Sequence, residues 1–302
     1  MSLYIEIWMQ VEMEALWRLT QTPELHAQWD LRFSEIVYLP RPDPDLPQQF
    51  LYQTRIGFGK VIAGEGETVG SRNAEDGCRT SALKFWSDDP LSLIREGSGY
   101  WQYQPEAQGV RFLTRYDYRT RFGRVGSLCD RLVFRPLMGW ATAWSFDRLR
   151  LWLEKGIDPR LALERFLVHG IARITLAFIW LYQGIVPKLL FPDTGERAIL
   201  EHTHLFPGAE GTLLRAVGIG EALFGMSFLL CWHSRKPLFA NIALMILLAG
   251  GAWFSQPSLF VAPFNPATLN LSLIVLAMIA IFMQKDLPTA RNCRRRPEEK
   301  RP

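Results

Sequence analysis

Four long apolar stretches lie between residues 171 and 283, and the first 155 residues contain none. They cover residues 171–191, 213–232, 237–254 and 266–283. A helix needs about 20 mostly apolar residues to cross a bilayer core of roughly 30 Å, so each stretch is long enough or nearly so. Their short connections disfavour four buried helices of a soluble protein. The sequence predicts a water-soluble N-terminal half followed by an all-α bundle of four transmembrane helices.

The chain of 302 residues is long enough for two domains. We expect a soluble domain over residues 1–155, a linker or juxtamembrane helix over 156–170, a membrane domain over 171–285 and a basic tail over 286–302. Gly156-Ile-Asp-Pro159 indicates a break, after which Asp158 caps a helix that begins at Pro159 and enters the bilayer.

Basic residues predict the orientation of the spans, because loops rich in Lys and Arg stay in the cytoplasm. Only Lys188, Arg197 and Arg215 flank one end of the predicted bundle. The other end has thirteen: Lys155, Arg160, Arg165, Arg173, Arg235, Lys236, Lys285, Arg291, Arg294, Arg295, Arg296, Lys300 and Arg301. The N-terminus also lacks the pattern of a secretion signal. We expect a bacterial inner-membrane protein with both termini in the cytoplasm.

Glu221 lies eight residues inside the second predicted span, which is roughly 12 Å deep at about 1.5 Å per residue. Its neighbours Gly218, Ala222 and Gly225 are small and let another helix approach closely, so we expect Glu221 to point into the bundle. Antiparallel packing would place Tyr182 and Gln183 of the first span at a similar depth, with Lys188 in reach of the carboxylate. We expect these residues (Glu221, Lys188, Gln183 and Tyr182) to form an intramembrane polar site. This site has two interpretations: it transfers protons or binds the headgroup of a ligand, or it only links two helices. Pro187 is expected to break the first span beside the site.

The sequence motifs give little support for a metal site or a redox centre. Glu201-His202-Thr203-His204 contains residue types that bind zinc, but a solvated loop is the simpler interpretation. The four cysteines, Cys78, Cys129, Cys231 and Cys293, are widely spaced and form no CxxC pair. We expect no metal site, and no cofactor is evident from the residues.

The first 155 residues read as strands with helices at both ends. We expect a strand over 3–11, helices over 12–20 and 22–30, strands over 32–39, 50–58, 60–69, 80–86, 92–104 and 110–121, and a long helix over 126–155 that Pro136 or Gly139 could bend. One face of the last strand should be buried; it carries Val110, Phe112, Thr114, Tyr116 and Tyr118. The other face carries Arg111, Arg115 and Arg119. We expect that face to be solvated rather than to bind nucleic acid. Gly64-Glu-Gly66 and the following residues to Gly70 are interpreted as a pair of turns.

This order, together with the run Trp29-Asp-Leu-Arg-Phe-Ser-Glu-Ile36, resembles the α+β helix-grip domain of the START-like polyketide cyclase and dehydrase superfamily. The resemblance implies an apolar cavity between a curled antiparallel sheet and the long C-terminal helix. Residues expected to line it are Trp8, Trp29, Phe85, Tyr100, Trp101, Phe112, Tyr116, Trp140 and Trp144, with ordinary core packing as the alternative for each.

The run from Arg173 to Pro192, Arg-Ile-Thr-Leu-Ala-Phe-Ile-Trp-Leu-Tyr-Gln-Gly-Ile-Val-Pro-Lys-Leu-Leu-Phe-Pro, resembles the first span of the DoxX-like membrane proteins, and Glu221 lies where those proteins carry an acidic residue. That resemblance implies a link to quinone-dependent membrane oxidoreductases, with quinone as a possible ligand.

Three functions remain open. The first is a membrane protein whose cytoplasmic domain takes an apolar ligand, such as a lipid or isoprenoid, from the membrane. The second is a quinone-interacting accessory of a membrane or cytoplasmic oxidoreductase. The third is a scaffold for a partner enzyme. The residues leave open whether any reaction is catalysed.

Overall fold

The computed structural model describes residues 2–43, 45–193, 197, 207–263 and 265–297. The chain forms two compact units. The first comprises Met1–Ala162 together with Pro288–Pro302, and the second comprises Leu163–Leu287. The C-terminal segment, expected to be only a basic tail, therefore folds with the N-terminal unit.

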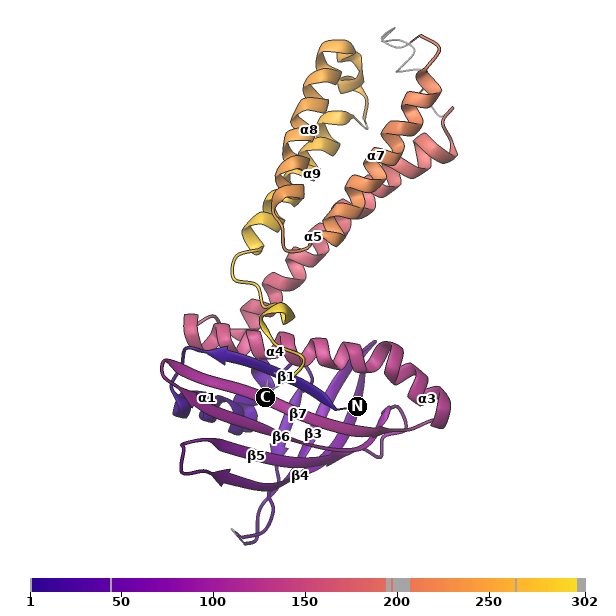
Figure 1. Ribbon diagram of the computed structural model, residues 1–302. Coiled ribbons are helices and arrows are strands. Elements are labelled where there is room, and N and C mark those ends of the chain that lie inside the picture. The colour runs from indigo at the N-terminus through magenta and orange to yellow at the C-terminus, as the bar shows by residue number, and fades with distance from the viewer. Residues whose placement is uncertain (1, 44, 194–196, 198–206, 264, 298–302) are drawn as a thin grey trace, which may run out of the picture. The chain divides into compact units, whose positions relative to one another are not determined.

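The N-terminal unit contains one antiparallel sheet of seven strands in the order β1-β7-β6-β5-β4-β3-β2 (Figure 1). The strands are β1 (Leu3–Met9), β2 (Glu35–Tyr38), β3 (Gln49–Gly57), β4 (Lys60–Asn73), β5 (Arg79–Trp86), β6 (Ile94–Glu106) and β7 (Gly109–Thr120). The first strand pairs with the last, and the others follow as hairpins, so the sheet forms from simple up-and-down connections.

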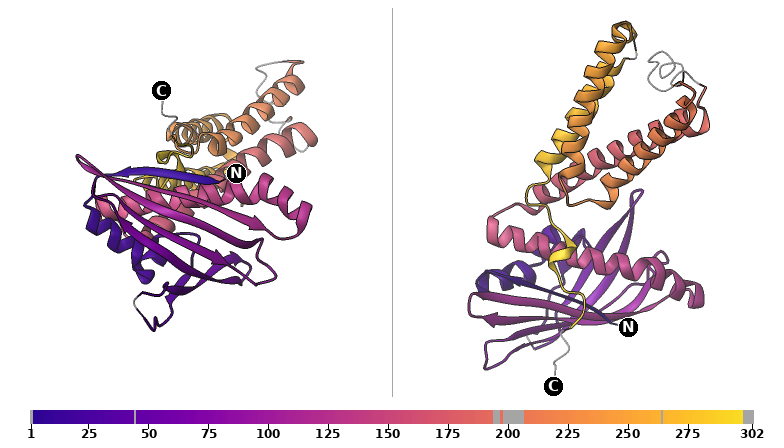
Figure 2. Two further views of the ribbon diagram at one scale, coloured as in Figure 1. Left: turned by 60° about the horizontal axis from the view of Figure 1, so that its bottom comes forward. Right: turned by 45° about the horizontal axis from the view of Figure 1, so that its top comes forward.

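The helices of this unit are α1 (Met13–Gln21), α2 (Pro23–Trp29), α3 (Gly123–Cys129) and α4 (Arg135–Lys155). A π-helical turn, η1 (Asp130–Phe134), joins α3 to α4, and a 3₁₀ turn, η4 (Ala290–Asn292), lies in the C-terminal segment. The long helix α4 lies across one face of the curled sheet (Figure 2). This is the predicted helix-grip arrangement. The helix expected over 126–155 is divided into α3, η1 and α4, and Pro136 lies directly after the π-helical turn, at the start of α4.

The face of β7 predicted to be buried is buried. Val110, Phe112, Thr114, Tyr116 and Tyr118 all have exposed fractions of 7% or less. On the opposite face Arg115 and Arg119 are exposed and Arg111 is half-buried. The two-residue period of a strand explains why the alternation in the sequence identified the inner face.

The segment after the last apolar helix packs on α4 and on the free edge of β1. The backbone N–H of Glu6 donates to Arg294 O (2.9 Å), and the N–H of Arg294 donates to Glu6 O (2.8 Å). The buried carboxylate of Asp147 on α4 accepts from the Thr289 N–H (2.8 Å) and from Asn292 Nδ2 (2.9 Å). The segment thus covers part of an otherwise open sheet edge.

The second unit contains η2 (Val186–Leu190), α7 (Glu210–Leu230), α8 (Lys236–Ser255), η3 (Pro257–Val261), α9 (Pro266–Met283) and most of α5 (Pro159–Ile185). Within the described residues, four helices are long and apolar enough to cross a membrane: Pro159–Leu190, Glu210–Leu230, Lys236–Phe254 and Pro266–Met283. The first begins at Pro159, as predicted. Asp158 caps it, because its Oδ1 accepts from the N–H groups of Arg160 (2.8 Å) and Leu161 (3.2 Å).

Buried polar side chains join three of these helices. Trp180 Nε1 on α5 donates to Asn241 Oδ1 on α8 (2.8 Å), and Asn241 Nδ2 donates to Leu273 O on α9 (3.1 Å). Asn241 is fully buried, so its amide is satisfied on both sides by other helices. Such bonds are one source of helix association where water is absent.

Candidate functional site

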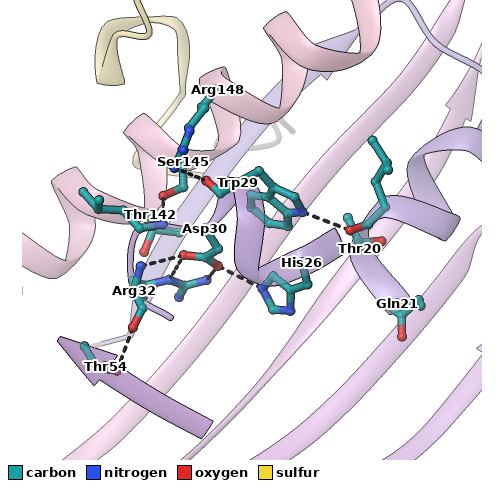
Figure 3. Close-up of polar contacts among 12 residues, drawn as sticks. Thr20, Gln21, His26, Trp29, Asp30, Arg32, Thr54, Thr142, Ser145 and Arg148 are labelled. Carbon is teal, nitrogen blue, oxygen red and sulfur yellow. Dashed lines mark hydrogen bonds and ion pairs between the residues drawn. The ribbon is translucent and has the colours of Figure 1, made fainter. Parts of the chain in front are cut away.

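A polar cluster lies inside the N-terminal unit, where α2 ends and the chain turns toward β2 (Figure 3). The Arg32 guanidinium donates to both carboxylate oxygens of Asp30, from Nε to Oδ1 (2.9 Å) and from Nη2 to Oδ2 (2.6 Å). His26 Nε2 lies 3.1 Å from Asp30 Oδ2. The Asp30 side chain is fully buried and that of Arg32 is 11% exposed, so the pair is shielded from water.

The charge states in this cluster follow from burial and pairing. Burial opposes ionisation of Asp30, but the adjacent Arg32 holds the pKa of that carboxyl well below its usual range. Burial also opposes the charge on Arg32, but Asp30 raises the pKa of the guanidinium above its ordinary value. Burial lowers the pKa of His26, an effect that the bond to Asp30 only partly offsets. The cluster therefore contains one ion pair and a histidine whose neutral form is favoured.

Aromatic rings surround the histidine. The ring centroid of His26 lies 4.9 Å from that of Trp101, 5.0 Å from that of Trp29 and 5.2 Å from that of Phe33. Trp29 is held at its indole nitrogen, which donates to Leu19 O at 3.0 Å. The polar groups thus lie within a mostly aromatic environment.

The helix α4 fixes the backbone of the same turn. Ser145 Oγ accepts from the Leu31 N–H (2.8 Å), and Arg148 Nη1 donates to Trp29 O (3.4 Å). Arg148 is buried, and burial lowers its pKa to about 10, which leaves it charged at neutral pH. The turn that presents Asp30 and Arg32 is therefore positioned by α4 and is not a free loop.

Three aromatic residues on the inner face of the sheet each lie over a glycine of the next strand. Tyr52 pairs with Gly64, Phe50 with Gly66, and Phe85 with Gly97. A Cβ atom added at these glycines would lie within 2.2–2.4 Å of the ring, so no side chain larger than hydrogen fits under it. Gly64 and Gly66, expected to form turns, instead lie inside β4. We call these three pairs the aromatic floor.

The residues expected to line a cavity divide between the two faces of the sheet. Trp29, Trp101, Phe112, Tyr116 and Trp144 are buried in the interior, and Phe85 lies half-buried in the aromatic floor. The α4 residue Trp140 is half-buried, with its ring centroid 6.3 Å from that of Trp144.

Trp8 and Tyr100 correct that expectation. They are paired with Arg111 and Arg115, so they lie on the opposite face, and Trp8 is 43% exposed. Successive side chains of a strand point to opposite faces, and these two point to the outer face instead of the inner one.

His26, Asp30 and Arg32 were not predicted as site residues. Asp30 and Arg32 lie in the run that carries the START-like resemblance, and two opposite charges flanked by Trp29 and Phe33 were the available signal. The sequence could not show that α4, more than a hundred residues later, would bury this run.

The second unit contains an ion pair at the predicted position. Lys188 Nζ lies 2.9 Å from Glu221 Oε2 and also donates to Gln183 O (3.2 Å). Lys188 is buried and the Glu221 side chain is 18% exposed. Tyr182 is not part of this site: it is 50% exposed and its ring lies beside that of Phe178.

Glycines allow this close approach of α5 and α7. A Cβ atom added to Gly184 would lie 2.5 Å from Gly218 O, and one added to Gly218 would lie 2.7 Å from Gly184 O. The small-residue face predicted around Glu221 is therefore a helix contact. Near Pro187 the helix continues as a π-helical turn, in which the Phe191 N–H donates to Val186 O (2.9 Å), so the expected break is a local widening.

The predicted His202 and His204 lie outside the described residues. Among the residues that the structure describes, no group of three or more His, Cys, Asp and Glu side chains is arranged to hold a metal ion.

Parts of the chain are similar to known proteins. Residues 177–278 match the DoxX-like family. The uncharacterized membrane protein YndG of Bacillus subtilis is 50% identical over 183 residues, which cover 60% of this chain and 68% of YndG.

The solved structures that are similar to about half of the chain include the following two. A STAR-related lipid transfer protein fragment from Xanthomonas axonopodis is 18% identical, with 50% of this chain and 84% of that chain covered and a TM-score of 0.37. The protein TTHA0849 from Thermus thermophilus is 16% identical, with 50% and 97% covered and a TM-score of 0.37. The chain is a membrane protein that belongs to the family of YndG, with a DoxX-like region over residues 177–278.

Proposed function

We propose that this membrane protein binds an apolar ligand, such as a lipid or isoprenoid, on the inner face of its N-terminal sheet. The aromatic floor is the observation that carries the proposal. Glycines under Tyr52, Phe50 and Phe85 let the rings lie against the backbone and form an apolar layer. Phe50 and Tyr52 are buried in this layer, and Phe85 is half-buried. Glycine inside a strand often marks a place where another group approaches the backbone closely, and three such glycines lie together here.

The polar cluster suits the same role. Sites for apolar ligands are mostly aromatic and aliphatic, with a few positioned polar groups that set orientation. Here Arg32 lies near the floor: its Cζ is 5.4 Å from the ring centroid of Phe33, and the rings of Phe33 and Tyr52 are 5.6 Å apart. A ligand on the floor would have the buried Arg32–Asp30 ion pair at one end, which favours an apolar molecule with a polar head.

The test uses the full chain in vesicles that contain a diazirine-labelled fatty acid. After photolysis, we expect cross-links on peptides that contain Phe50, Tyr52 and Phe85. The variant Gly64→Ala should lose them, because its new methyl would meet only the far end of the Tyr52 ring and turn that ring upward. The double variant Gly64→Ala/Tyr52→Ala should recover them.

Cross-links confined to α5, α7, α8 and α9 in the unaltered protein would contradict the proposal. Tryptophan fluorescence of each variant, compared with the unaltered chain, checks that the N-terminal unit is folded.

We further propose that the N-terminal unit and the C-terminal segment both lie in the cytoplasm, at the bacterial inner membrane. The contacts of Thr289, Asn292 and Arg294 with the N-terminal unit support a shared side, because an even number of crossings must then separate them. The basic residues support the cytoplasmic side. Green fluorescent protein fused after Pro302 should fluoresce and alkaline phosphatase should be inactive; the reverse result would contradict this orientation.

A second candidate, interaction with a quinone, is favoured by the ion pair of Lys188 and Glu221 beside the Gln183 carbonyl. Intramembrane charges at helix contacts often serve ligands. Glu221→Gln should abolish photolabelling by an azidoquinone while the protein remains folded. Undiminished labelling would leave the ion pair as a link between helices.

A further inference from the structure

An apolar strip extends along α3, η1 and the first turn of α4. Its members are large side chains with exposed fractions between 54% and 76%: Phe122, Val125, Leu128, Leu132, Val133 and Leu137. Val125, Leu128 and Leu132 are three and four residues apart, which places them on one side of a helix. We call these six residues the α3 strip.

The opposite side of the same segment is anchored to the sheet. Asp130 is buried and accepts a hydrogen bond from the Tyr118 hydroxyl (2.6 Å) and another from Arg135 Nε (2.8 Å). Gly126 is buried as well. The segment is therefore not free to rotate its apolar residues inward, and their exposure is a property of the fold.

A contiguous exposed apolar strip marks an interaction surface more often than a chance arrangement. The charges beside it favour a lipid surface. Arg124 and Arg131 are both exposed and flank the strip. A helical segment with an apolar side and basic residues along its border is the pattern of segments that lie in the interface of an anionic bilayer.

The chain also keeps the strip close to a bilayer. The segment is continuous with α4, which ends at Lys155, and the first candidate span begins at Pro159. From Val125 to Lys155 the helical path is about 45 Å at 1.5 Å per residue. The chain thus tethers the strip within reach of the membrane that the spans cross. Among apolar partners, lipid therefore has the highest effective concentration at the strip.

We propose that the α3 strip inserts into the boundary between headgroups and acyl chains of an anionic bilayer. Val125, Leu128 and Leu132 enter the acyl region, and Arg124 and Arg131 contact lipid phosphates. The N-terminal unit is then held on the membrane by two attachments, the span that begins at Pro159 and the strip. This does not depend on whether the aromatic floor binds a ligand.

Spin labels test the insertion in the full chain, reconstituted in vesicles of phosphatidylethanolamine and phosphatidylglycerol. Cys78, Cys129 and Cys231 are replaced by alanine, and single labels are attached through Val125→Cys, Leu128→Cys or Leu132→Cys. Gln108→Cys, in the exposed turn between β6 and β7, is the aqueous control, and Leu247→Cys, exposed on α8, is the lipid control. Power saturation compares the accessibility of each label to oxygen and to a water-soluble nickel chelate.

The three strip labels should be accessible to oxygen and protected from the nickel chelate, as the label at position 247 is. Arg124→Glu/Arg131→Glu should shift them toward the values at position 108. Nickel accessibility equal to that at position 108 would overturn the proposal. Low accessibility to both reagents would overturn it too, because it would mean that protein, such as a second copy, covers the strip.

Discussion

Arg32 and Asp30 form a bidentate ion pair inside the N-terminal unit, with N···O distances of 2.9 and 2.6 Å. They are two residues apart in the chain, and α4 anchors the turn that contains them through Ser145 and Arg148. A buried pair of this kind contributes less to stability than it costs when one partner is removed. The stability of variants at this pair is therefore a sensitive test of whether α4 is correctly placed.

Removal of one partner should destabilise the protein strongly. Arg32→Met leaves the Asp30 carboxylate buried with only His26 and the backbone N–H of residue 32 as hydrogen-bond partners. We expect a loss of about 3–5 kcal/mol in the free energy of unfolding of the N-terminal unit. Chemical denaturation followed by tryptophan fluorescence measures it. The matched control Arg119→Met changes an exposed arginine on the outer face and should cost less than about 1 kcal/mol. Equal effects of the two substitutions would show that the buried pair has no special role.

Stability should fall as the pH drops below about 6.5, because the pKa of His26 is lowered in the folded protein. Above the unfolded pKa both states hold a neutral imidazole and the group contributes no pH dependence. Between that value and the lower folded pKa, only the unfolded state binds the proton. The free energy of unfolding therefore falls as the pH is lowered, until the pH reaches the folded pKa. The difference between the unaltered protein and His26→Gln, measured by thermal unfolding from pH 5 to 7.5, isolates this contribution; identical pH profiles would refute it.

Cys293 should resist modification while the C-terminal segment is docked. Its thiol is buried, it contacts Ala143 O (3.2 Å), and burial raises its pKa, so the reactive thiolate is scarce. N-ethylmaleimide at pH 7.5 should label the exposed Cys129 and spare Cys293, as read by peptide mass spectrometry.

The variant Asp147→Ala removes the acceptor for Thr289 and Asn292 and should make Cys293 reactive. Glu154→Ala, also on α4 and without a bond to this segment among the described contacts, is the control. Protection of Cys293 in both variants would show that Asp147 does not hold the segment.

Lys188 and Glu221 should be coupled energetically. Lys188→Met or Glu221→Leu alone leaves one charge inside the helix contact and should cost about 3–5 kcal/mol, whereas Lys188→Met/Glu221→Leu removes both charges and should recover most of that loss. Unfolding in detergent mixtures by sodium dodecyl sulfate measures the cycle. Additive losses would mean that the two side chains do not stabilise each other.

The patterns that could be interpreted from the sequence are local and periodic. Alternation in residues 110–118 identified the inner face of β7, and unbroken apolar stretches identified four spans, because strand and helix periods act over neighbouring residues. Small residues around Glu221 predicted a helix contact for the same reason. The phase error at Trp8 and Tyr100 shows the limit of this approach: aromatic character alone does not tell which side of a sheet a residue occupies.

Contacts between distant segments could not be predicted from such patterns. The hydrogen bond that Asn292 donates to Asp147 joins residues 145 positions apart. The floor requires Tyr52 to lie over Gly64 in a register that the turn between β3 and β4 sets. Composition and periodicity were enough for the membrane region and the order of strands and helices, since both depend on the hydrophobic effect acting on short segments. The buried ion pair, the aromatic floor and the docking of the C-terminal segment arise when the chain folds and brings remote side chains together, and their geometry exists only in three dimensions.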